Sequence, residues 1–293
     1  MGIHRLIIGR LVAGVLGIFS SSALADSDDI NPMLDKTYGI WIGGFFPELN
    51  TTVSINGEVI ENNPNLSLED VFGLDDAKSV LWGGANWKIS KRNLLEIEFA
   101  NLNRNGTSII EAEINIDDTI ANVGAMSDTK FDLFIARLTY GYGLVKNKKM
   151  DLQLKVGFHL TDIQLGIQLS GDIEVCQPGE IPPNCDAIGG ETESLETSDI
   201  TFPLPHLGAS FAYALSPNFV LRAQAIGFAI EMNGIKGSLL EIDADLVYHP
   251  WRRVGFGAGV RYFNANVESS GYRLDGEIDF EYFGPAVYGI ITF

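Results

Sequence analysis

Val287-Tyr288-Gly289-Ile290-Ile291-Thr292-Phe293 ends the sequence and decides the fold that we expect. Successive side chains of a β-strand point to opposite faces, so every second residue from Val287 to Phe293 lies on one face. A strand that carries such an apolar row and stops on a phenylalanine is out of place in a soluble domain. The stretch therefore predicts the last strand of a barrel that closes within a lipid bilayer.

The other end of the sequence predicts export. Residues 1–25 combine Arg5 and Arg10 with a short apolar run, and they end on Ala23-Leu24-Ala25. A basic start, a short apolar run and a small-residue cleavage site are the marks of a secretory signal peptide.

The rest of the chain has no run of about 18 apolar residues, so no helix is expected to cross a membrane. Only helices and closed sheets satisfy every backbone polar group in hydrocarbon, so an exported chain with alternating apolar residues is expected to form a closed antiparallel barrel. We assign residues 26–36 to a periplasmic N-terminal segment and residues 37–293 to a transmembrane, up-and-down, all-β barrel. A soluble periplasmic β-sandwich is the alternative.

The charge distribution gives this barrel a direction. The sequence has 38 acidic and 20 basic residues and a formal net charge of −18, which excludes a general nucleic-acid binder because that class needs a basic face. Short turns carry bases and long excursions carry acids, and in such barrels short turns face the periplasm and long loops the outside. The basic turns are Lys91-Arg92, Lys146 to Lys149 and Arg252-Arg253, and the acidic excursions run from Glu58 to Asp76, Glu111 to Asp118, Glu174 to Asp199 and Glu268 to Glu281.

Short turns near Lys91, Asn147, Pro217 and Pro250 index the strands, because each joins two alternating segments. Four turns join eight strands, and two terminal strands make ten, an even number as bacterial barrels require. Eight or twelve strands remain alternatives. The expected strands are 37–46, 77–89, 93–104, 129–145, 150–169, 200–214, 218–232, 237–249, 253–267 and 276–293.

Several of these strands change their apolar phase partway along. In residues 150–169 the apolar side chains are even-numbered up to Leu160 and odd-numbered from Ile163. Lipid draws apolar side chains outward and water drives them inward, so we expect the strands to continue beyond the membrane, on the extracellular side, around an apolar core. We expect bulges at the phase changes, with Gly284-Pro285 as one of them. The candidate core residues are Ile163, Leu165, Ile167, Phe202, Phe228, Ile230, Phe263, Ile278 and Phe280.

Charged residues take the opposite phase, on the face that we assign to the lumen. Five acids there face four bases, with His159 nearby. Buried charges persist only when they are paired, so a salt-bridge network that plugs the barrel is one interpretation. A gated polar path for small ions is the other. The residues are Glu96, Glu98, Arg137, Lys155, His159, Arg222, Glu241, Asp243, Asp245 and Arg261.

Cys176 and Cys185 are the only cysteines, and they bracket a short loop in an exported chain. Because the periplasm is oxidising, the pair predicts a disulfide rather than a metal site, which would need further ligands nearby. We expect no metal site and no cofactor.

No constellation of residues predicts a reaction. Omptin proteases also have ten strands, but they use paired aspartates and an Asp–His couple at the extracellular mouth. Beyond residue 25 this chain has His159, His206 and His249, and His159 to Asp162 is its most triad-like segment. Asp162 points away from His159 on a strand, so we expect no catalytic residues. A lipid-modifying enzyme is a distant alternative.

Three stretches together resemble an uncharacterised family of proteobacterial outer-membrane barrels. They are Leu66 to Asp75, Asn86 to Asn93, and Phe283-Gly284-Pro285 leading to Phe293. The resemblance implies the outer membrane of a Gram-negative bacterium and implies no reaction. We also expect the bilayer, lipopolysaccharide and, through the strand that ends at Phe293, the barrel-assembly machinery as partners, and no nucleic acid.

The function that follows is a structural or surface-interaction role with a largely plugged lumen, in which the apolar set merely packs the extension shut. The alternative is a narrow channel or a binder of a small apolar ligand, as in barrels that resemble the outer-membrane protein W and fatty-acid transporter families. In that case the apolar set lines a cavity.

Overall fold

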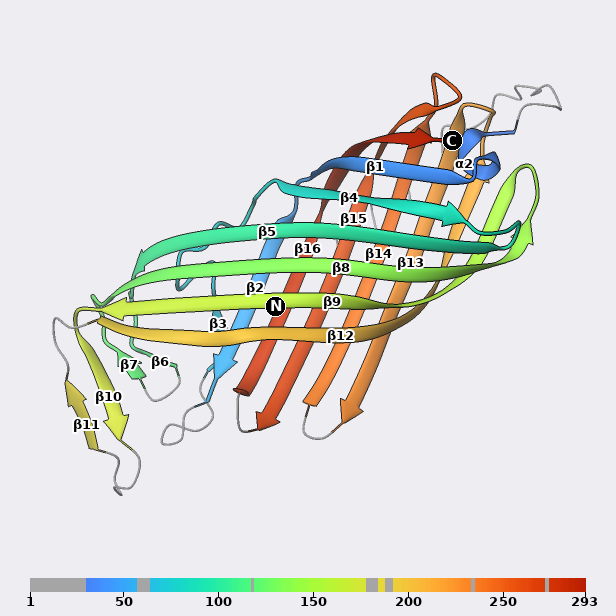
Figure 1. Cartoon of the computed structure of the whole chain (residues 1–293). Coiled ribbons are helices and arrows are strands. Elements are labelled where there is room, and N and C mark those ends of the chain that lie inside the picture. Colours follow the sequence, from blue (N-terminus) through green and yellow to red (C-terminus); the bar gives the residue numbers. More distant parts are fainter. Residues whose placement is uncertain are drawn as a thin grey trace, which may run out of the picture.

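The computed structural model describes residues 30–56, 64–116, 119–177, 184–187, 192–232, 235–271 and 274–293. Ten antiparallel strands close into a barrel (Figure 1), which confirms the predicted fold. The barrel strands are β1 (Tyr38–Phe45), β4 (Val80–Lys88), β5 (Asn93–Ile109), β8 (Met126–Lys146), β9 (Met150–Ser170), β12 (Thr192–Ala214), β13 (Phe219–Met232), β14 (Ile235–Tyr248), β15 (Val254–Gly271) and β16 (Leu274–Thr292). The predicted signal peptide lies outside the described residues.

Pairing between the first and last strands closes the barrel. β1 runs antiparallel to β16 from Gly39, opposite Thr292, to Phe45, opposite Ala286. The Tyr38 amide donates to the Phe293 carbonyl at 2.8 Å, so the closure is hydrogen-bonded to the final residue. A closed sheet has no free edge, which is what hydrocarbon requires of strands that cross it.

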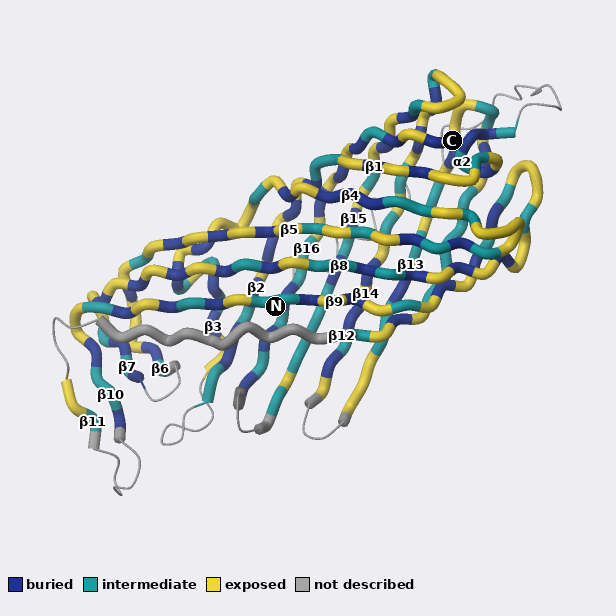
Figure 2. The backbone as a smooth tube through the Cα atoms, viewed as in Figure 1, coloured by how far each residue is buried: buried dark blue, intermediate teal, exposed yellow. Residues whose placement is uncertain are grey.

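Buried and exposed residues alternate along the strands, as Figure 2 shows by colour. In β9, odd-numbered residues face inward from Asp151 to Leu169. The inward row is mostly polar up to Thr161 and apolar from Ile163 on, and the outward row changes in the opposite sense. The same residues by number face inward along the whole strand, but the inward side chains change from polar to apolar and the outward ones from apolar to polar.

The bulge expected at Gly284-Pro285 is absent, so that prediction was wrong. β16 pairs with β15 in unbroken register through both residues. The β13–β14 and β14–β15 pairings are also in register throughout. A bulge would turn the apolar residues back to the outside, whereas an unbroken strand carries them from the lipid-facing side to the interior.

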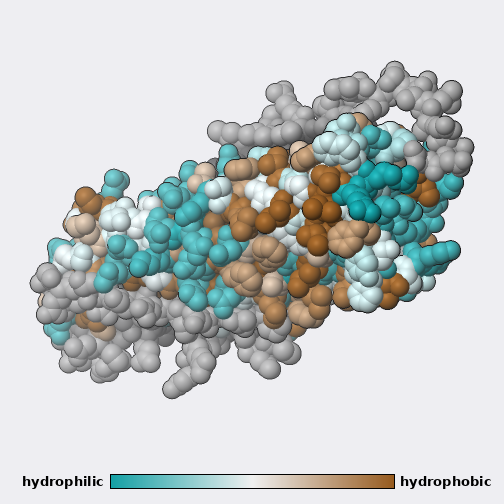
Figure 3. Space-filling model, turned by 45° about the horizontal axis from the view of Figure 1, so that its top comes forward, coloured by the Kyte–Doolittle hydropathy of each residue, from teal (hydrophilic) through white to brown (hydrophobic). Residues whose placement is uncertain are grey.

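Exposed apolar side chains form a belt around the half of the barrel that carries the short turns. We call this the lower half and the half with the long strand ends the upper half; in Figure 1 the lower half lies at the top right. On β9 the belt runs from Leu154 to Leu160, and beyond it the outward residues are polar, beginning with Asp162. Figure 3 shows the same change on one face, with apolar surface gathered toward the short-turn end and polar surface toward the long strand ends. Exposed aromatic residues border the belt at the short turns: Trp87, Tyr142, Tyr213, Tyr248 and Trp251.

Toward the end of the long strands the wall divides into two sheets, which diverge in Figure 1. β12 pairs with β13 only between Leu207 and Ala214, although β12 continues along β9 and β13 continues along β14. On the other side the chain turns at Phe46-Pro47 into β2 (Glu48–Ile55), which pairs with β16. One sheet therefore consists of the upper β5, β8, β9 and β12, and the other of β13 to β16 with β2.

Residues 64–79, which we call the 64–79 segment, lie between β2 and β5. β3 (Leu66–Ser67) pairs with β2, and Leu74 forms a bridge to Gly106 of β5. The Ser67 hydroxyl accepts from the Asp70 amide at 3.1 Å, so this segment contains a short capped turn. The segment was expected to be an external loop, but its apolar side chains close the space between the sheets.

A small separate sheet, which we call the tip sheet, lies at the end of the long strands. It consists of β6 (Ile114–Ile116), β7 (Thr119–Ala121), β10 (Ile173–Gln177) and β11 (Asn184–Ala187). Cys176 and Cys185 are directly opposite in β10 and β11 and form a disulfide, which confirms that prediction.

The N-terminal segment covers the mouth of the barrel at the short-turn end with a single helical turn, α2 (Pro32–Asp35). The Asn31 side chain accepts from the Met33 amide at 3.0 Å and donates to the Pro217 carbonyl at 2.9 Å. Leu34 is buried against Ala214 and Val220. In the part of the chain that the structure describes, no helix has the length and apolar content to cross a membrane.

Candidate functional site: the lumen charge network

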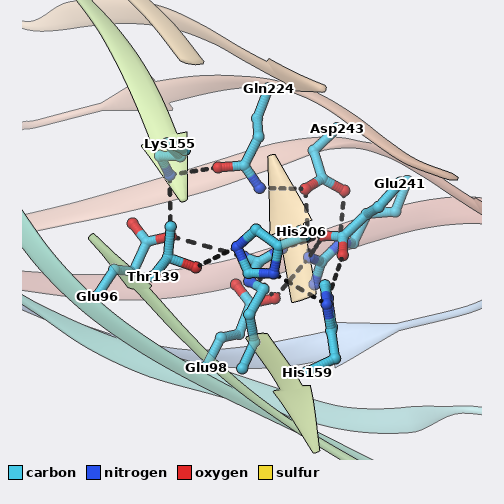
Figure 4. A network of polar contacts seen from close by, with 11 residues as sticks. Glu96, Glu98, Thr139, Lys155, His159, His206, Gln224, Glu241 and Asp243 are labelled. Atoms are coloured by element: carbon cyan, nitrogen blue, oxygen red, sulfur yellow. Dashed lines mark hydrogen bonds and ion pairs between the residues drawn. The ribbon is translucent and has the colours of Figure 1, made fainter. Parts of the chain in front are cut away.

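The charged side chains predicted to face the lumen all lie on inward rows of the barrel. Because β5, β8, β9, β13, β14 and β15 are neighbours in the wall or face one another across it, their inward residues meet at one level (Figure 4). The ten residues are Glu96 and Glu98 on β5, Arg137 on β8, Lys155 and His159 on β9, Arg222 on β13, Glu241, Asp243 and Asp245 on β14, and Arg261 on β15.

Two arginines form the centre of this network. Arg137 contacts Glu241 at 2.5 Å and Glu98 at 3.0 Å. Arg261 contacts Glu98 at 2.8 Å, Asp243 at 2.9 Å and Glu241 at 3.1 Å. The carboxylates of Glu98 and Glu241 are thus shared by both guanidinium groups, which joins β5, β8, β14 and β15 across the lumen.

Two further bases extend the network toward the short-turn end. The Lys155 ammonium lies 3.0 Å from a Glu96 carboxylate oxygen and also donates to the Gln224 side chain. Arg222 Nε lies 3.5 Å from Asp245 Oδ1. Each of the nine charged residues in the predicted set therefore has a partner of opposite charge.

A pair of histidines adjoins the network. His159 Nε2 lies 3.4 Å from Glu241 Oε2, and His159 Nδ1 lies 3.1 Å from His206 Nδ1. The other nitrogen of His206 is 3.1 Å from the Thr139 hydroxyl. Both rings are buried. The contact between the two rings is a hydrogen bond when one of them carries its proton on Nδ1.

The sequence did not predict that His206 joins His159. β9 and β12 are connected by a long excursion, so the register that brings His206 opposite Gly157 could not be counted from a short turn. Alternation did place both rings near the polarity change of their strands, and that was the available signal.

The network leaves little free space. A cavity of about 20 Å³ remains beside Trp82, Arg137 and Arg261, and the Arg261 guanidinium covers the Trp82 ring at 4.1 Å. Such a volume holds about one water molecule. Buried charges are costly when one partner is lost, so a fully paired set of this kind favours a closed lumen over a wet path. Among the described residues, no group of histidine, cysteine and acidic side chains is placed to hold a metal ion.

Most of the candidate extension residues lie in an apolar core above the network. Five are buried and two are partly buried against that core. Ile230 is a correction, since it is 40% exposed near the end of β13, where β12 no longer covers it. The side chain of Phe202 lies outside the described part. The buried residues are Leu165, Ile167, Phe263, Ile278 and Phe280, and the partly buried ones are Ile163 and Phe228.

Sequence reasoning missed a buried arginine in this core. Arg104 on β5 is fully buried; its guanidinium contacts Glu69 of the 64–79 segment at 2.5 Å and donates to the Thr51 hydroxyl on β2. It also covers the Phe131 ring at 4.8 Å. Its even number, in phase with Glu96 and Glu98, was the signal that it points inward.

A polar vestibule lies between the network and α2. Its volume is about 80 Å³, and Met33, Lys88, Asp151 and Lys155 are among the residues that line it. The Lys88 ammonium donates to the Met33 carbonyl at 2.6 Å and so holds α2 over the mouth. The vestibule ends at the network, because Lys155 belongs to both.

Comparison with known proteins places the fold. No protein-family model and no curated protein matches the chain. Among solved structures, outer membrane protease OmpT from Escherichia coli matches with a TM-score of 0.52 and 11% identity, over 89% of this chain and 97% of that chain. Ail, the attachment invasion locus protein of Yersinia pestis, matches with a TM-score of 0.28 and 11% identity (86% and 98% covered), and the P. putida toluene transporter TodX with 0.34 and 8% (89% and 91%). At this identity the similarity to OmpT concerns architecture and not chemistry: the chain has the fold of the bacterial outer-membrane β-barrels.

Proposed function

We propose that this protein is a non-conducting outer-membrane barrel that presents a rigid two-sheet extension at the cell surface, in a structural or surface-interaction role. The belt lies in the bilayer of a Gram-negative outer membrane, and lipopolysaccharide surrounds its extracellular rim. The strand that ends at Phe293 is the part that the barrel-assembly machinery engages.

Obstruction of the lumen at successive levels is the observation that carries this proposal. α2 covers the periplasmic mouth, the charge network crosses the middle, and the apolar core fills the extension. The apolar cavity in that core, beside Leu102 and Leu133, has a volume of about 20 Å³. That is about the size of one water molecule, so this cavity gives no support to storage of an apolar solute inside the core.

We further propose that the chain has no catalytic role. His159 and His206 are both buried in the lumen rather than at an extracellular mouth. His159 meets Glu241, whose carboxylate is already shared with two arginines. A hydrolytic site needs a substrate position beside its base, and the 20 Å³ cavity of the network offers none.

Conductance in planar bilayers tests the closed lumen. We expect the purified protein and the Arg222→Ala variant to be equally silent, because Arg222 contributes one contact, to Asp245, at the edge of the plug. If the lumen were a gated polar path, the loss of this inward charge would change the conductance of the Arg222→Ala variant. Conductance steps from the unchanged protein would overturn the proposal.

A positive control shows that the assay can detect an opened lumen. Arg137→Ser combined with Glu241→Ser removes the central pair without changing the net charge. We expect this double variant to conduct, once circular dichroism and the heat-dependent shift of the folded band on a gel have shown that it folds. If the double variant folds and is also silent, the network is not what closes the lumen.

A further inference from the structure

Hydrogen bonding between β12 and β13 is confined to the lower part of the wall. The last pair is Leu207 opposite Gly227, and above it each strand stays paired with its other neighbour only. We call the unpaired stretch, residues 203–206 of β12 and 228–230 of β13, the β12–β13 seam.

Two prolines, Pro203 and Pro205, lie on β12 along this seam. A proline has no amide hydrogen and is found in sheets almost only where a neighbouring strand is missing. One residue separates the two, so their nitrogens point to the same side of the strand. Pairing with β9 continues in register past both, opposite Leu160 and Phe158, whereas pairing with β13 has stopped. The missing donors therefore belong to the seam side.

The seam begins within the apolar belt. Leu207, at its lower end, faces outward and is 68% exposed, and it lies opposite Val156 of β9, which also faces outward. The belt on β9 continues to Leu160, which is about 13 Å further along the strand at 3.3 Å per residue. The unpaired stretch thus lies beside the part of the belt that runs from Phe158 to Leu160.

Apolar side chains of the inward row line the seam. Leu204 and Phe228, one from each strand, are partly buried and pack against the apolar core. Ile230 follows Phe228 in the same row and is 40% exposed, whereas Ile226, below the seam, is buried. The inward row becomes accessible where β12 leaves β13.

From this geometry we propose that the β12–β13 seam binds the hydrocarbon chain of an outer-leaflet lipid. On the β12 side the prolines leave no unpaired amide hydrogen, so contact with a hydrocarbon chain, which makes no hydrogen bonds, costs less there than at an ordinary strand edge. An added peptide strand would find the donors at both prolines missing. The chain would pass from the belt onto Leu204 and Phe228, and the polar headgroup would stay at the upper rim of the belt. This proposal does not depend on the surface role proposed above.

Quenching by brominated lipid tests the seam. The Phe228→Trp variant is placed in vesicles of phosphatidylcholine brominated on its acyl chains, because bromine quenches tryptophan fluorescence on contact. Leu240→Trp is the lipid-facing control, and Phe131→Trp is the inward control on the hydrogen-bonded wall between β5 and β9. The signal of the four native tryptophans is measured on the unchanged protein and subtracted.

We expect Phe228→Trp to lose nearly as much fluorescence as Leu240→Trp, and Phe131→Trp to lose little. Quenching of Phe228→Trp no greater than that of Phe131→Trp overturns the proposal. If Phe228→Trp does not fold, Leu204→Trp reports on the same seam from the other strand. Replacing both prolines, with Pro203→Val and Pro205→Val, restores the donors and is expected to reduce the quenching at position 228; unchanged quenching would overturn the role of the prolines.

Discussion

Arg104 shows how one buried charge can hold an extended wall together. Its guanidinium joins β5 to the Glu69 carboxylate of the 64–79 segment and to Thr51 of β2, inside an apolar core. The Thr51 amide also donates to Glu69, at 2.9 Å, so these three residues fix the segment from both sides. The charge of Glu69 is tolerated there because Arg104 faces it.

Arg104→Met is expected to lower the stability of the folded protein by about 3–5 kcal/mol, because it leaves the Glu69 carboxylate without its cation. The matched control is Lys236→Met, which breaks the exposed pair with Glu268 and is expected to change the stability little, because solvent screens a surface ion pair. Urea unfolding in lipid vesicles measures both. Equal losses would show that the Arg104 contact is no stronger than a surface pair.

His249 gives the molecule an acid-sensitive position outside the membrane-spanning strands. It lies buried in the turn after β14, and this burial lowers its pKa from the ordinary value of 6.5. The unfolded chain therefore binds a proton more readily than the folded one. The contribution of the neutral ring to stability is complete above about pH 6.5 and is lost as the pH falls below that value.

We expect His249→Gln to reduce this loss, since glutamine stays neutral. The measurement is the urea midpoint of the unchanged protein and of the variant, near pH 7.5 and near pH 5. The drop in midpoint between the two conditions should be smaller for the variant. The same drop in both proteins would assign the acid sensitivity to other groups.

At the scale of the elements, strands joined by short turns could be predicted from the sequence, whereas the pairing of strands joined by long connections could not. The turn at Asn147 marks where β8 ends and β9 begins, and alternation along each strand predicts Arg137 and Lys155 on inward rows. The turn alone does not set which residues lie opposite each other, because the register shifts by one residue between Gly143 and Val145. The continuation of the first strand into β2 was not predicted, because Pro47 interrupts the alternation between β1 and β2. The contact between His206 and His159 also depends on a register that no short turn sets.

The strand lengths show the same limit. β12 begins at Thr192, eight residues before the expected start. This stretch is polar and does not itself indicate a strand; it is extended because it pairs with β9. Pairing across a closed barrel is a property of two sequences together. A single strand therefore cannot reveal where its partner leaves it, as β13 leaves β12.

Cys185→Ser tests the role of the disulfide at the level of the tip sheet. Closing so short a loop contributes on the order of 2–3 kcal/mol in the chain-entropy model. We expect proteinase K to cut the variant in β10 or β11 several-fold faster than the unchanged protein, while the barrel fragment stays resistant. The unchanged protein under reducing conditions should behave in the same way as the variant. Cleavage at an unchanged rate would mean that strand pairing alone protects the tip.

The whole molecule consists of two halves of opposite polarity that share the same strands. The lower half has an apolar exterior and a charged interior, and the upper half has a polar exterior and an apolar core. The short basic turns and α2 lie at one end, and the tip sheet lies at the other (Figure 1). This polarity predicts which end faces the medium.

Labelling of intact cells tests that orientation. Asp128→Cys places a thiol on the exposed face of β8 above the belt, and Lys91→Cys places one in a short turn. We expect a membrane-impermeant maleimide to label Asp128→Cys on whole cells and to label Lys91→Cys only after the outer membrane is broken. The native cysteines are bonded to each other and should not react. Labelling of Lys91→Cys on whole cells would reverse the orientation.

The polar exterior of the upper half has a consequence for biogenesis. The carboxylates of Glu277, Asp279 and Glu281 lie in the outward row of β16 directly above the belt. Before that strand can reach its final position from the periplasm, this row must traverse the hydrocarbon that Val287 and Ile291 later occupy. Spontaneous insertion into pure lipid should therefore be slow, and delivery would require an escort that thins the bilayer or shields the acids in transit.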